Sequence, residues 1–293
     1  ALMYLNQITF PDRESEGSFF AGIMRTVYDS YYPYQVLSKN AFSQIDFEPI
    51  TILYGGNGSG KTTALNVLAE KIGAQRSAAY NRSNFFEDYL DQCHCIVTNE
   101  PKIKQILTSD DVFDYMLDIR NLNQGIDRRR EEVFDEYFEA KYANFRFKGF
   151  EDYERLKKIN LARSNTQSKF TRKNLMDNVR EFSNGENAAS FFQEKIVPNG
   201  LYLLDEPENS LSAQRQIELV AFIEDMTRYE HCQFVIATHS PFVLSIKEPK
   251  IYDLDQKPVD VLLWTQLENV QTYYRFFQMH QEAFEDEKRR TDQ

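Results

Sequence analysis

Gly55-Gly56-Asn57-Gly58-Ser59-Gly60-Lys61-Thr62 is the stretch of sequence that decides the fold. Two glycines bracket four residues and are followed by a lysine and a hydroxyl residue, which is the Walker A pattern of a loop that wraps phosphates. The glycines let successive backbone N–H groups turn inward around an anion. Lys61 can reach the β- and γ-phosphates of a nucleotide, and the Thr62 hydroxyl can hold Mg²⁺. The stretch therefore predicts a phosphate-binding loop at residues 55–62, with Thr63 next to it.

The residues on either side of this loop predict a strand before it and a helix after it. Residues 49–54 form a short apolar, β-branched run of the kind found in buried strands. After the loop, apolar residues recur at helical spacing, and Gly73 is typical of a helix stop. The apolar positions are Ala64, Leu65, Leu68, Ala69 and Ile72. This order places a helix N-terminus, with its partial positive charge, under the phosphates.

Composition limits the class of protein. A chain of 293 residues with 42% hydrophobic content can build one large or two modest globular domains. No apolar run approaches the roughly 18 residues that span a bilayer, and the N-terminus lacks a basic segment followed by an apolar one. Three cysteines are too few for a disulfide framework. We therefore expect a cytoplasmic protein without membrane insertion.

Charge is unevenly spread along the chain. The net charge of −11 argues against a whole surface that binds nucleic acid. Residues 141–180, however, hold eleven basic and four acidic residues, a net charge of +7. This segment is either a solvated helical face or a contact for phosphates of nucleic acid or nucleotide. We favour the solvated face, because a charge run alone identifies no ligand.

The middle of the chain predicts a helical insertion. From about Ile103 to Arg180 the sequence is charged and punctuated by aromatic residues, as in surface helices. Two apolar stripes stand out, Val112, Tyr115, Met116 and Ile119, and Val133, Phe134, Tyr137 and Phe138. No heptad pattern persists for three or four repeats, so we expect a compact helical subdomain and no long coiled-coil arm. The predicted division is 1–98, 99–180 and 181–293.

Two local features near the N-terminus have competing interpretations. Tyr31, Tyr32 and Tyr34 could stack on an adenine ring, but tyrosines around a proline are more often packing residues. Cys93-His94-Cys95 has the wrong spacing for a zinc pair and lacks a second pair, so we favour a core strand at residues 94–98. The residues before Tyr31 are expected to form a strand at 4–10 and a polar loop through Gly17.

Residues 200–207 predict a second component of the site. An apolar run that ends in Asp205 and Glu206 is typical of a strand buried on both faces that carries a Walker B motif. The acids then lie at the carboxyl end of the strand, where open α/β sheets bind ligands. Asp205 would help to hold Mg²⁺, and Glu206 would polarise the attacking water.

Residues 182–186 open a helix. Ser183 and Glu186 are spaced as a capping box, which is a structural role in its own right. The same geometry, with the Gly185 N–H exposed at a helix N-terminus, can bind an anion such as the γ-phosphate of a nucleotide on another subunit. Both roles can hold together.

The last motif follows another buried strand, residues 233–237, and reads Thr238-His239-Ser240-Pro241. A histidine at the carboxyl end of a strand could contact the γ-phosphate and orient the water. Near the other motifs we favour this role for His239 over a purely structural one.

The order of the motifs resembles that of the ABC-type ATPases. It runs from the phosphate loop through Ser-Asn-Gly-Glu and Leu-Leu-Asp-Glu-Pro-Glu to Thr-His-Ser-Pro. The likeness is to the branch related to the SMC and double-strand-break-repair ATPase heads, and within it to small bacterial "AAA family ATPase" proteins. It covers about 50–73 and 181–246, and continues through residues 251–254. The resemblance implies an α/β P-loop NTPase with a mostly parallel sheet, helices on both faces and an inserted helical subdomain.

The resemblance also implies roles for individual residues. Gly55, Gly56, Asn57, Gly58, Ser59, Gly60, Lys61, Thr62 and Thr63 would bind ATP, with Thr62 and Asp205 on Mg²⁺. Glu206, His239 and Lys61 would be catalytic. Ser183, Gly185 and Glu186 would be the signature, and residues 208–212 the D-loop. Members of the family work as head-to-tail homodimers that sandwich two ATP molecules.

This sequence departs from the family pattern in two places. Phe182, Asn184 and Glu186 stand where the common signature has Leu, Gly and Gln. The glutamine that usually follows the strand after Walker A is missing, and Asn99 or Glu100 stands nearest to its place.

Three functions are compatible with these observations. The first is ATP hydrolysis coupled to dimerisation, in a DNA-related or anti-phage defence process. The second is a nucleotide-gated clamp for DNA or for an effector protein, with little turnover, which the basic segment at 141–180 motivates. The third, least favoured, is the energy subunit of a membrane transporter.

Overall fold

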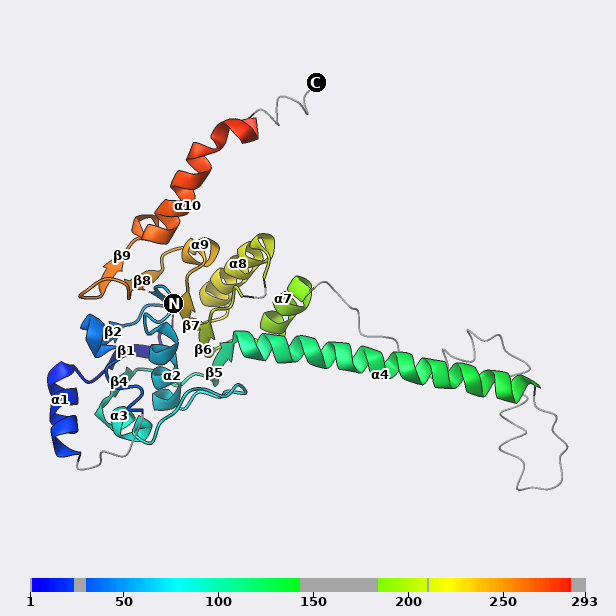
Figure 1. Cartoon of the computed structure of the whole chain (residues 1–293), viewed down its shortest axis with the longest axis horizontal. Coiled ribbons are helices and arrows are strands. Elements are labelled where there is room, and N and C mark those ends of the chain that lie inside the picture. Colours follow the sequence, from blue (N-terminus) through cyan, green and yellow to red (C-terminus); the bar gives the residue numbers. More distant parts are fainter. Residues whose placement is uncertain (1, 24–29, 143–183, 210, 286–293) are drawn as a thin grey trace. The chain divides into compact units, whose positions relative to one another are not determined.

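The computed structural model describes residues 2–23, 30–142, 184–209 and 211–285 (Figure 1). The chain divides into two compact units, one formed by residues 1–113 and 184–293 and the other by residues 114–183. The basic segment predicted at 141–180 therefore lies almost entirely outside the described residues, and so does Ser183.

A six-stranded sheet forms the centre of the first unit, in the order β5-β6-β7-β3-β8-β9. Its strands are β3 (Ile50–Tyr54), β5 (Ile103–Thr108), β6 (Gly200–Asp205), β7 (Gln233–Thr238), β8 (Lys250–Asp253) and β9 (Asp260–Leu262). All neighbours pair in parallel except β8 and β9. The predicted α/β fold with a mostly parallel sheet is confirmed.

Helices precede, separate and follow these strands in the described part of the chain (Figure 1). They are α1 (Arg13–Gly22), α2 (Lys61–Ile72), α3 (Phe86–Gln92), α4 (Ser109–Tyr142), α7 (Asn184–Lys195), α8 (Ala213–Tyr229), α9 (Pro241–Leu244) and α10 (Glu268–Met279), with short 3₁₀ turns at Ser38–Asn40 and Trp264–Gln266. Both α2 and α8 contact β7, and every residue of β3 and β7 is buried. Strands buried on both faces are what a sheet covered on both sides requires.

A second sheet, antiparallel and three-stranded, has the order β2-β1-β4, with β1 at Leu5–Thr9, β2 at Gln44–Asp46 and β4 at His94–Val97. One buried glutamine joins it to the larger sheet. The Oε1 atom of Gln233, on β7, accepts hydrogen bonds from the backbone N–H groups of Tyr4 and Leu5 at 3.0 and 2.9 Å. Its Nε2 atom donates to the Leu5 carbonyl at 2.8 Å, so the side chain acts as a substitute for sheet pairing.

The predicted strand before the loop and the predicted helix after it are both present. Helix α2 runs from Lys61 to Ile72 and ends at Gly73, whose φ of +68° is the left-handed conformation that glycine adopts readily. Its apolar face, including Leu65 and Leu68, is fully buried in the main hydrophobic core. The helix that positions the loop is therefore fixed by burial as well as by its cap.

Near the N-terminus the structure corrects one sequence prediction and agrees with another. The polar loop expected through Gly17 is a helix, α1, because Asp12 caps it by accepting the N–H of Ser15 at 2.8 Å. Tyr34 is 3% exposed and stacks on Phe19 at 4.5 Å between ring centroids. Tyr34 is therefore a packing residue, and it cannot offer a face to an adenine ring.

The helical segment begins later than predicted. Residues 103–108 form β5 rather than helix, because they pair with β6 in parallel register from Ile103 opposite Gly200 onward. The helix that follows, α4, is continuous for 34 residues, about 50 Å at the usual rise per residue. The prediction of a compact subdomain did not anticipate so long a helix. Within it Val112, Met116, Val133 and Tyr137 are buried, as the apolar stripes predicted.

The C-terminal helix, α10, begins at Glu268 and ends at Met279, and residues 281–285 are again helical. It exposes a row of large apolar side chains, Tyr273, Tyr274, Phe276, Phe277 and Met279. None of the helices in the described part of the chain is long and apolar enough to cross a membrane.

Candidate functional site

The carboxyl ends of three neighbouring strands bring the predicted motifs together. Strands β6, β7 and β3 are adjacent and parallel, so the residues that follow them meet at one edge of the sheet. The loop at 55–60 follows β3, Asp205 ends β6, and His239 follows β7. The order of strands thus assembles a site from residues that lie up to 184 positions apart in the sequence.

The conformation of the loop at 55–60 depends on glycine at two positions. At Gly55 the φ angle is +157°, and an added Cβ atom would lie 2.5 Å from the Ser59 hydroxyl oxygen. At Gly60 φ is +102°, and a Cβ atom would lie 3.1 Å from Leu37. A side chain at either place would force the loop to change shape. The loop follows directly on β3 and opens directly into α2, as the sequence predicted.

Lys61 lies along the inside of this loop. Its Nζ atom donates to the carbonyl oxygens of Gly55 and Gly56 at 2.6 and 3.0 Å and lies 3.8 Å from Oε1 of Glu206. The side chain is only 4% exposed. A buried ammonium group held by carbonyls can turn its hydrogen bonds toward phosphate oxygens, which are stronger acceptors because they are charged.

The pair predicted to hold Mg²⁺ is in contact. The Thr62 hydroxyl, at the start of α2, donates to Oδ1 of Asp205 at 3.1 Å. Burial raises the pKa of Asp205 to about 6, although the hydrogen bond from Thr62 opposes this shift. A nearby divalent cation would favour the charged carboxylate that burial disfavours.

Hydroxyl and carboxylate oxygens suit Mg²⁺, which binds through one or two protein ligands together with phosphate oxygens and waters. Among the described residues, no group of three or more His, Cys, Asp and Glu side chains is arranged to hold a metal ion. The Thr62 hydroxyl and the Asp205 carboxylate supply two oxygen donors that suit Mg²⁺.

Glu206 has an unusual backbone. Its φ angle is +48°, a left-handed value that non-glycine residues seldom adopt and that is found at functional sites. Its N–H donates to the Ala237 carbonyl of β7 at 2.9 Å, and Asn209 donates to its Oε2 atom at 3.0 Å. Its Oε1 atom faces Lys61 and the ring of His239, both at 3.8 Å. Glu206 is thus held among the other predicted catalytic residues.

His239 stands at the end of β7 with 46% of its side chain exposed. Its backbone N–H donates to Oε1 of Glu208 at 3.0 Å, and its ring atom Nδ1 lies 3.5 Å from the same oxygen. Its carbonyl accepts a hydrogen bond from the Asn269 side chain of α10 at 2.9 Å. The histidine is therefore anchored by its backbone while its ring faces the acids.

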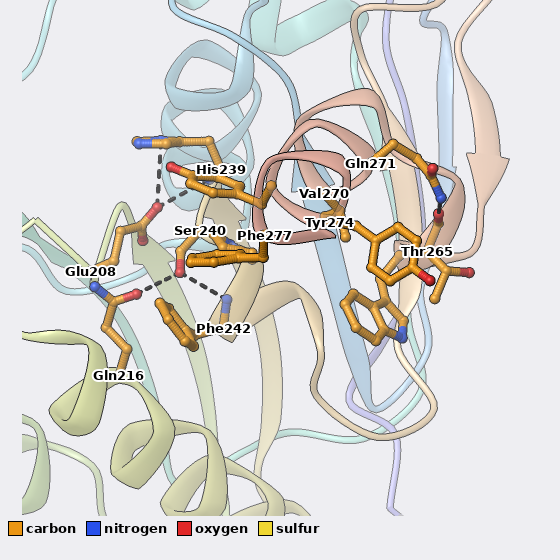
Figure 2. Close-up of a pocket in the computed structure, with 13 residues that line it drawn as sticks. Glu208, Gln216, His239, Ser240, Phe242, Thr265, Val270, Gln271, Tyr274 and Phe277 are labelled. Carbon is orange, nitrogen blue, oxygen red and sulfur yellow. Dashed lines mark hydrogen bonds and ion pairs between the residues drawn. The ribbon is translucent and has the colours of Figure 1, made fainter. Parts of the chain in front are cut away.

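A groove lies behind His239, with a volume of about 710 Å³. Figure 2 shows side chains of α10, including Tyr274 and Phe277, on one side and Ser240 and Phe242 on the other. Most of its surface is apolar, and Glu208 and Gln216 contribute polar groups. The groove borders the predicted catalytic histidine rather than the phosphate-binding loop.

The predicted signature is described only in its backbone. Gly185 and Glu186 lie in the first turn of α7, and the side chain of Glu186 lies outside the described residues, as does all of Ser183. Phe191 and Phe192 of the same helix are buried, as expected. The roles assigned to the three signature residues stay predictions.

Sequence reasoning missed two contacts to the site. Both carboxylate oxygens of Asp255 accept the N–H of Gly56, at 2.9 and 3.1 Å, which ties the loop to the segment after β8. The Tyr32 hydroxyl donates to Oγ1 of Thr63 at 3.2 Å. Neither contact has a sequence signal, because each depends on segments that only the fold brings together.

Residues 105–245 match the protein family described as "AAA domain, putative AbiEii toxin, Type IV TA system". The match spans just under half of the chain and contains Asp205, Glu206 and His239, while the Walker A loop precedes it. The match agrees with the recognition made from the order of the motifs, and the mostly parallel α/β sheet is of the P-loop NTPase type. No curated protein matches the chain in sequence.

Several solved structures resemble the chain weakly. The SMC head domain from Thermotoga maritima is 11% identical with a TM-score of 0.37, over 89% of this chain and 99% of that one. The Smc head domain from Pyrococcus furiosus, with an extended coiled coil and bound to the C-terminal domain of ScpA, is 12% identical with a TM-score of 0.37, over 79% and 95%. "A putative metal-chelate type ABC transporter" in an inward-facing conformation is 18% identical with a TM-score of 0.36, over 77% and 78%.

Proposed function

We propose that this protein binds Mg·ATP at residues 55–63 and hydrolyses it in the cytoplasm. The observation that carries the proposal is the convergence of Lys61, Thr62, Asp205, Glu206 and His239, from three strand ends, with neighbouring functional groups 3.1 to 3.8 Å apart. These are the residue types that phosphoryl transfer to water needs: a cation for the phosphates, a metal site, a base and a polar group near the attacking water.

In this proposal each residue has one task. Lys61 turns its hydrogen bonds from the loop carbonyls to the β- and γ-phosphates. Thr62 and Asp205 would hold Mg²⁺, which when bound would supply positive charge beside the phosphates. Glu206 accepts a proton from the attacking water, and His239 contacts the γ-phosphate and orients that water. Holding these groups in place before the reaction is the main source of rate enhancement in this chemistry.

The proposed site is completed by a second copy of the chain. Ser183, Gly185 and Glu186 of that copy would contact the γ-phosphate, so ATP would hold two copies head to tail and hydrolysis would release them. The support is the order of the motifs, in which a helix start of anion-binding type precedes the Walker B strand. The resulting conformational switch would serve a DNA-related or defence process.

The switch has two candidate targets, an effector protein and DNA. We favour the effector protein, because the description of the matching family names a toxin and a toxin–antitoxin system. The competing output, DNA binding through the basic segment at 141–180, rests on charge alone. Salt-sensitive DNA binding by the ATP-loaded protein would favour the clamp instead.

The test is the substitution Glu206→Gln, with ATP turnover and oligomeric state measured together. We expect hydrolysis to fall at least about a hundredfold, the scale for loss of one positioned general base. We also expect ATP to trap a stable dimer, seen by light scattering on a sizing column. The matched control is Glu218→Gln on the exposed side of α8, which should hydrolyse ATP at the wild-type rate.

Unchanged turnover in Glu206→Gln would remove Glu206 from the base role. A protein that stays monomeric with ATP would remove the second copy from the site. Substituting Ser183→Arg in the Glu206→Gln background separates these results, because a large side chain at a true dimer contact should prevent the trapped dimer without lowering ATP binding to one copy.

A further inference from the structure

The carboxylate of Glu208 lies beneath the loop that carries His239. Its side chain is 5% exposed. Its Oε1 atom accepts hydrogen bonds from the Thr238 hydroxyl at 2.6 Å and from the His239 backbone N–H at 3.0 Å. Figure 2 shows Glu208 directed at this loop from the side opposite α10. One oxygen thus fixes two consecutive residues at the end of β7.

The same oxygen also faces the ring of His239. Nδ1 of the ring lies 3.5 Å from Oε1 of Glu208 and 3.8 Å from Oε1 of Glu206. A carboxylate beside one ring nitrogen favours the form in which that nitrogen carries the proton. Two carboxylates beside Nδ1 therefore leave Nε2 as the ring atom available to groups outside the acidic cluster.

The other carboxylate oxygen of Glu208 is an exception to the rule that buried polar atoms are hydrogen-bonded. Oε2 is buried, and no described residue donates a hydrogen bond to it. Buried polar atoms without a partner are uncommon and require an explanation. A carboxylate only accepts hydrogen bonds, so Oε2 offers a second acceptor for the ring N–H of His239 if the ring moves toward it.

Two further hydrogen bonds hold this loop, one through the side chain of Ser240 and one through the backbone of His239. The Ser240 hydroxyl donates to Oε1 of Gln216 on α8 at 2.5 Å, and Asn269 of α10 donates to the His239 carbonyl. Glu208, unlike Ser240 and Asn269, contacts both the backbone N–H and the ring of His239. Removal of Glu208 should therefore disturb the ring more than removal of the other anchors.

We propose that Glu208 is a positioning residue that fixes the place of His239 and holds a ring proton on Nδ1. Glu208 acts through His239 and touches neither the nucleotide nor the attacking water. The inference rests on the proposed function for its consequence in catalysis, but the state of the ring can be measured without catalysis.

The first experiment is a double-mutant cycle on ATP turnover with Glu208→Ala and His239→Ala. We expect Glu208→Ala to lower kcat by about 10- to 100-fold, the range for misplacing a reacting group, with little change in KM. In the His239→Ala background the same substitution should change kcat less than about twofold, since Glu208 acts only through that ring. Glu208→Gln, which keeps an acceptor oxygen, should fall between wild type and Glu208→Ala.

The second experiment follows the His239 ring by ¹⁵N NMR in the nucleotide-free protein. The chain has four histidines, and His239→Ala identifies the signals of interest. We expect Nδ1 to carry the proton in wild type and the share of this form to fall in Glu208→Ala. Glu218→Gln is the matched control and should leave the ring signals unchanged.

The outcomes are separable. The inference would be overturned if the losses of kcat multiply in the double variant, or if the ring has the same protonated form in wild type and Glu208→Ala. Neither result would contradict the proposed ATPase function. A wild-type protein that does not hydrolyse ATP would overturn the proposed function, and the ring measurement would then decide the inference alone. Thermal unfolding of each variant identifies any loss that comes from a failure to fold.

Discussion

The two halves of the candidate site are built in different ways. The phosphate-binding half is one continuous stretch, residues 50–73, in which a buried strand, a glycine loop and a capped helix follow one another. The acidic half takes Asp205 and Glu206 from β6 and His239 from β7, and it depends on contacts such as that between Thr238 and Glu208. The first half is set by local sequence, and the second by strand pairing and buried polar contacts.

This difference predicts how each half will fail. A change in the continuous half should affect ATP binding directly, because its groups meet the phosphates. A change in the acidic half should leave binding largely intact and lower turnover, because its groups are held in place by one another. The predictions below test that division from the largest expected effect to the smallest.

Lys61→Ala should weaken ATP binding at least about a hundredfold, because hydrogen bonds to charged groups are each worth about 1.5–3 kcal/mol and Lys61 would serve two phosphates. Titration calorimetry measures the change. Lys71→Ala is the matched control, since Lys71 lies in the last turn of the same helix and donates to the Leu90 carbonyl. Equal affinities in the two variants would show that the loop lysine does not bind phosphate.

Asn209→Ala should lower kcat by about tenfold with KM unchanged, because Asn209 holds the carboxylate of Glu206 and misplacing a reacting group by about 1 Å costs up to about a hundredfold. Steady-state ATP turnover measures both constants. Gln214→Ala, at an exposed position in α8, is the control. A rise in KM alone would place Asn209 in binding rather than in positioning.

Asp205→Asn should change how stability depends on pH. Burial raises the pKa of Asp205 to about 6, above its value of about 3.9 in the unfolded chain. Its proton is therefore bound more tightly in the folded protein, and its contribution to stability is lost as the pH rises through 6. Relative to Asp205→Asn, the wild-type free energy of unfolding should fall by about 1.3 kcal/mol from pH 5 to pH 7.

Urea unfolding in the presence of a chelator, at both pH values, measures this difference. The comparison between the two proteins cancels the contributions of carboxyl groups whose pKa is lowered, such as Asp12 and Asp46. With Mg²⁺ and nucleotide added, wild type should lose affinity for the metal below pH 6. A difference in stability that does not vary with pH would show that Asp205 is not the group that titrates.

The same division explains what the sequence could predict. The strand, loop and helix at 50–73 follow from local patterns, and the burial of β6 and β7 follows from unbroken apolar runs, so these elements were predicted with nearly correct bounds. Residues 103–108 were wrongly predicted as helix because their pairing with β6 is a long-range effect. The left-handed backbone conformation of Glu206 and the hydrogen bond from the Gly56 N–H to Asp255 have no signal in the local sequence either.

The C-terminal helix illustrates a different limit. The row of exposed aromatic side chains along it was not predicted from the sequence. The periodicity of a single helix does not show whether another element covers its apolar side. Here Leu267 and Val270 are buried and anchor the helix, while Tyr273 and Phe276 are exposed.

Calorimetric titration of the Glu206→Gln protein with ATP in the presence of Mg²⁺ tests the central claim most directly, because binding can then be seen without turnover. If the strand ends form one Mg·ATP site, the titration will show one ATP bound per chain, and a chelator or the further substitution Lys61→Ala will weaken it. If the folded protein gives no heat of ATP binding in titrations at several temperatures, the result would contradict the account.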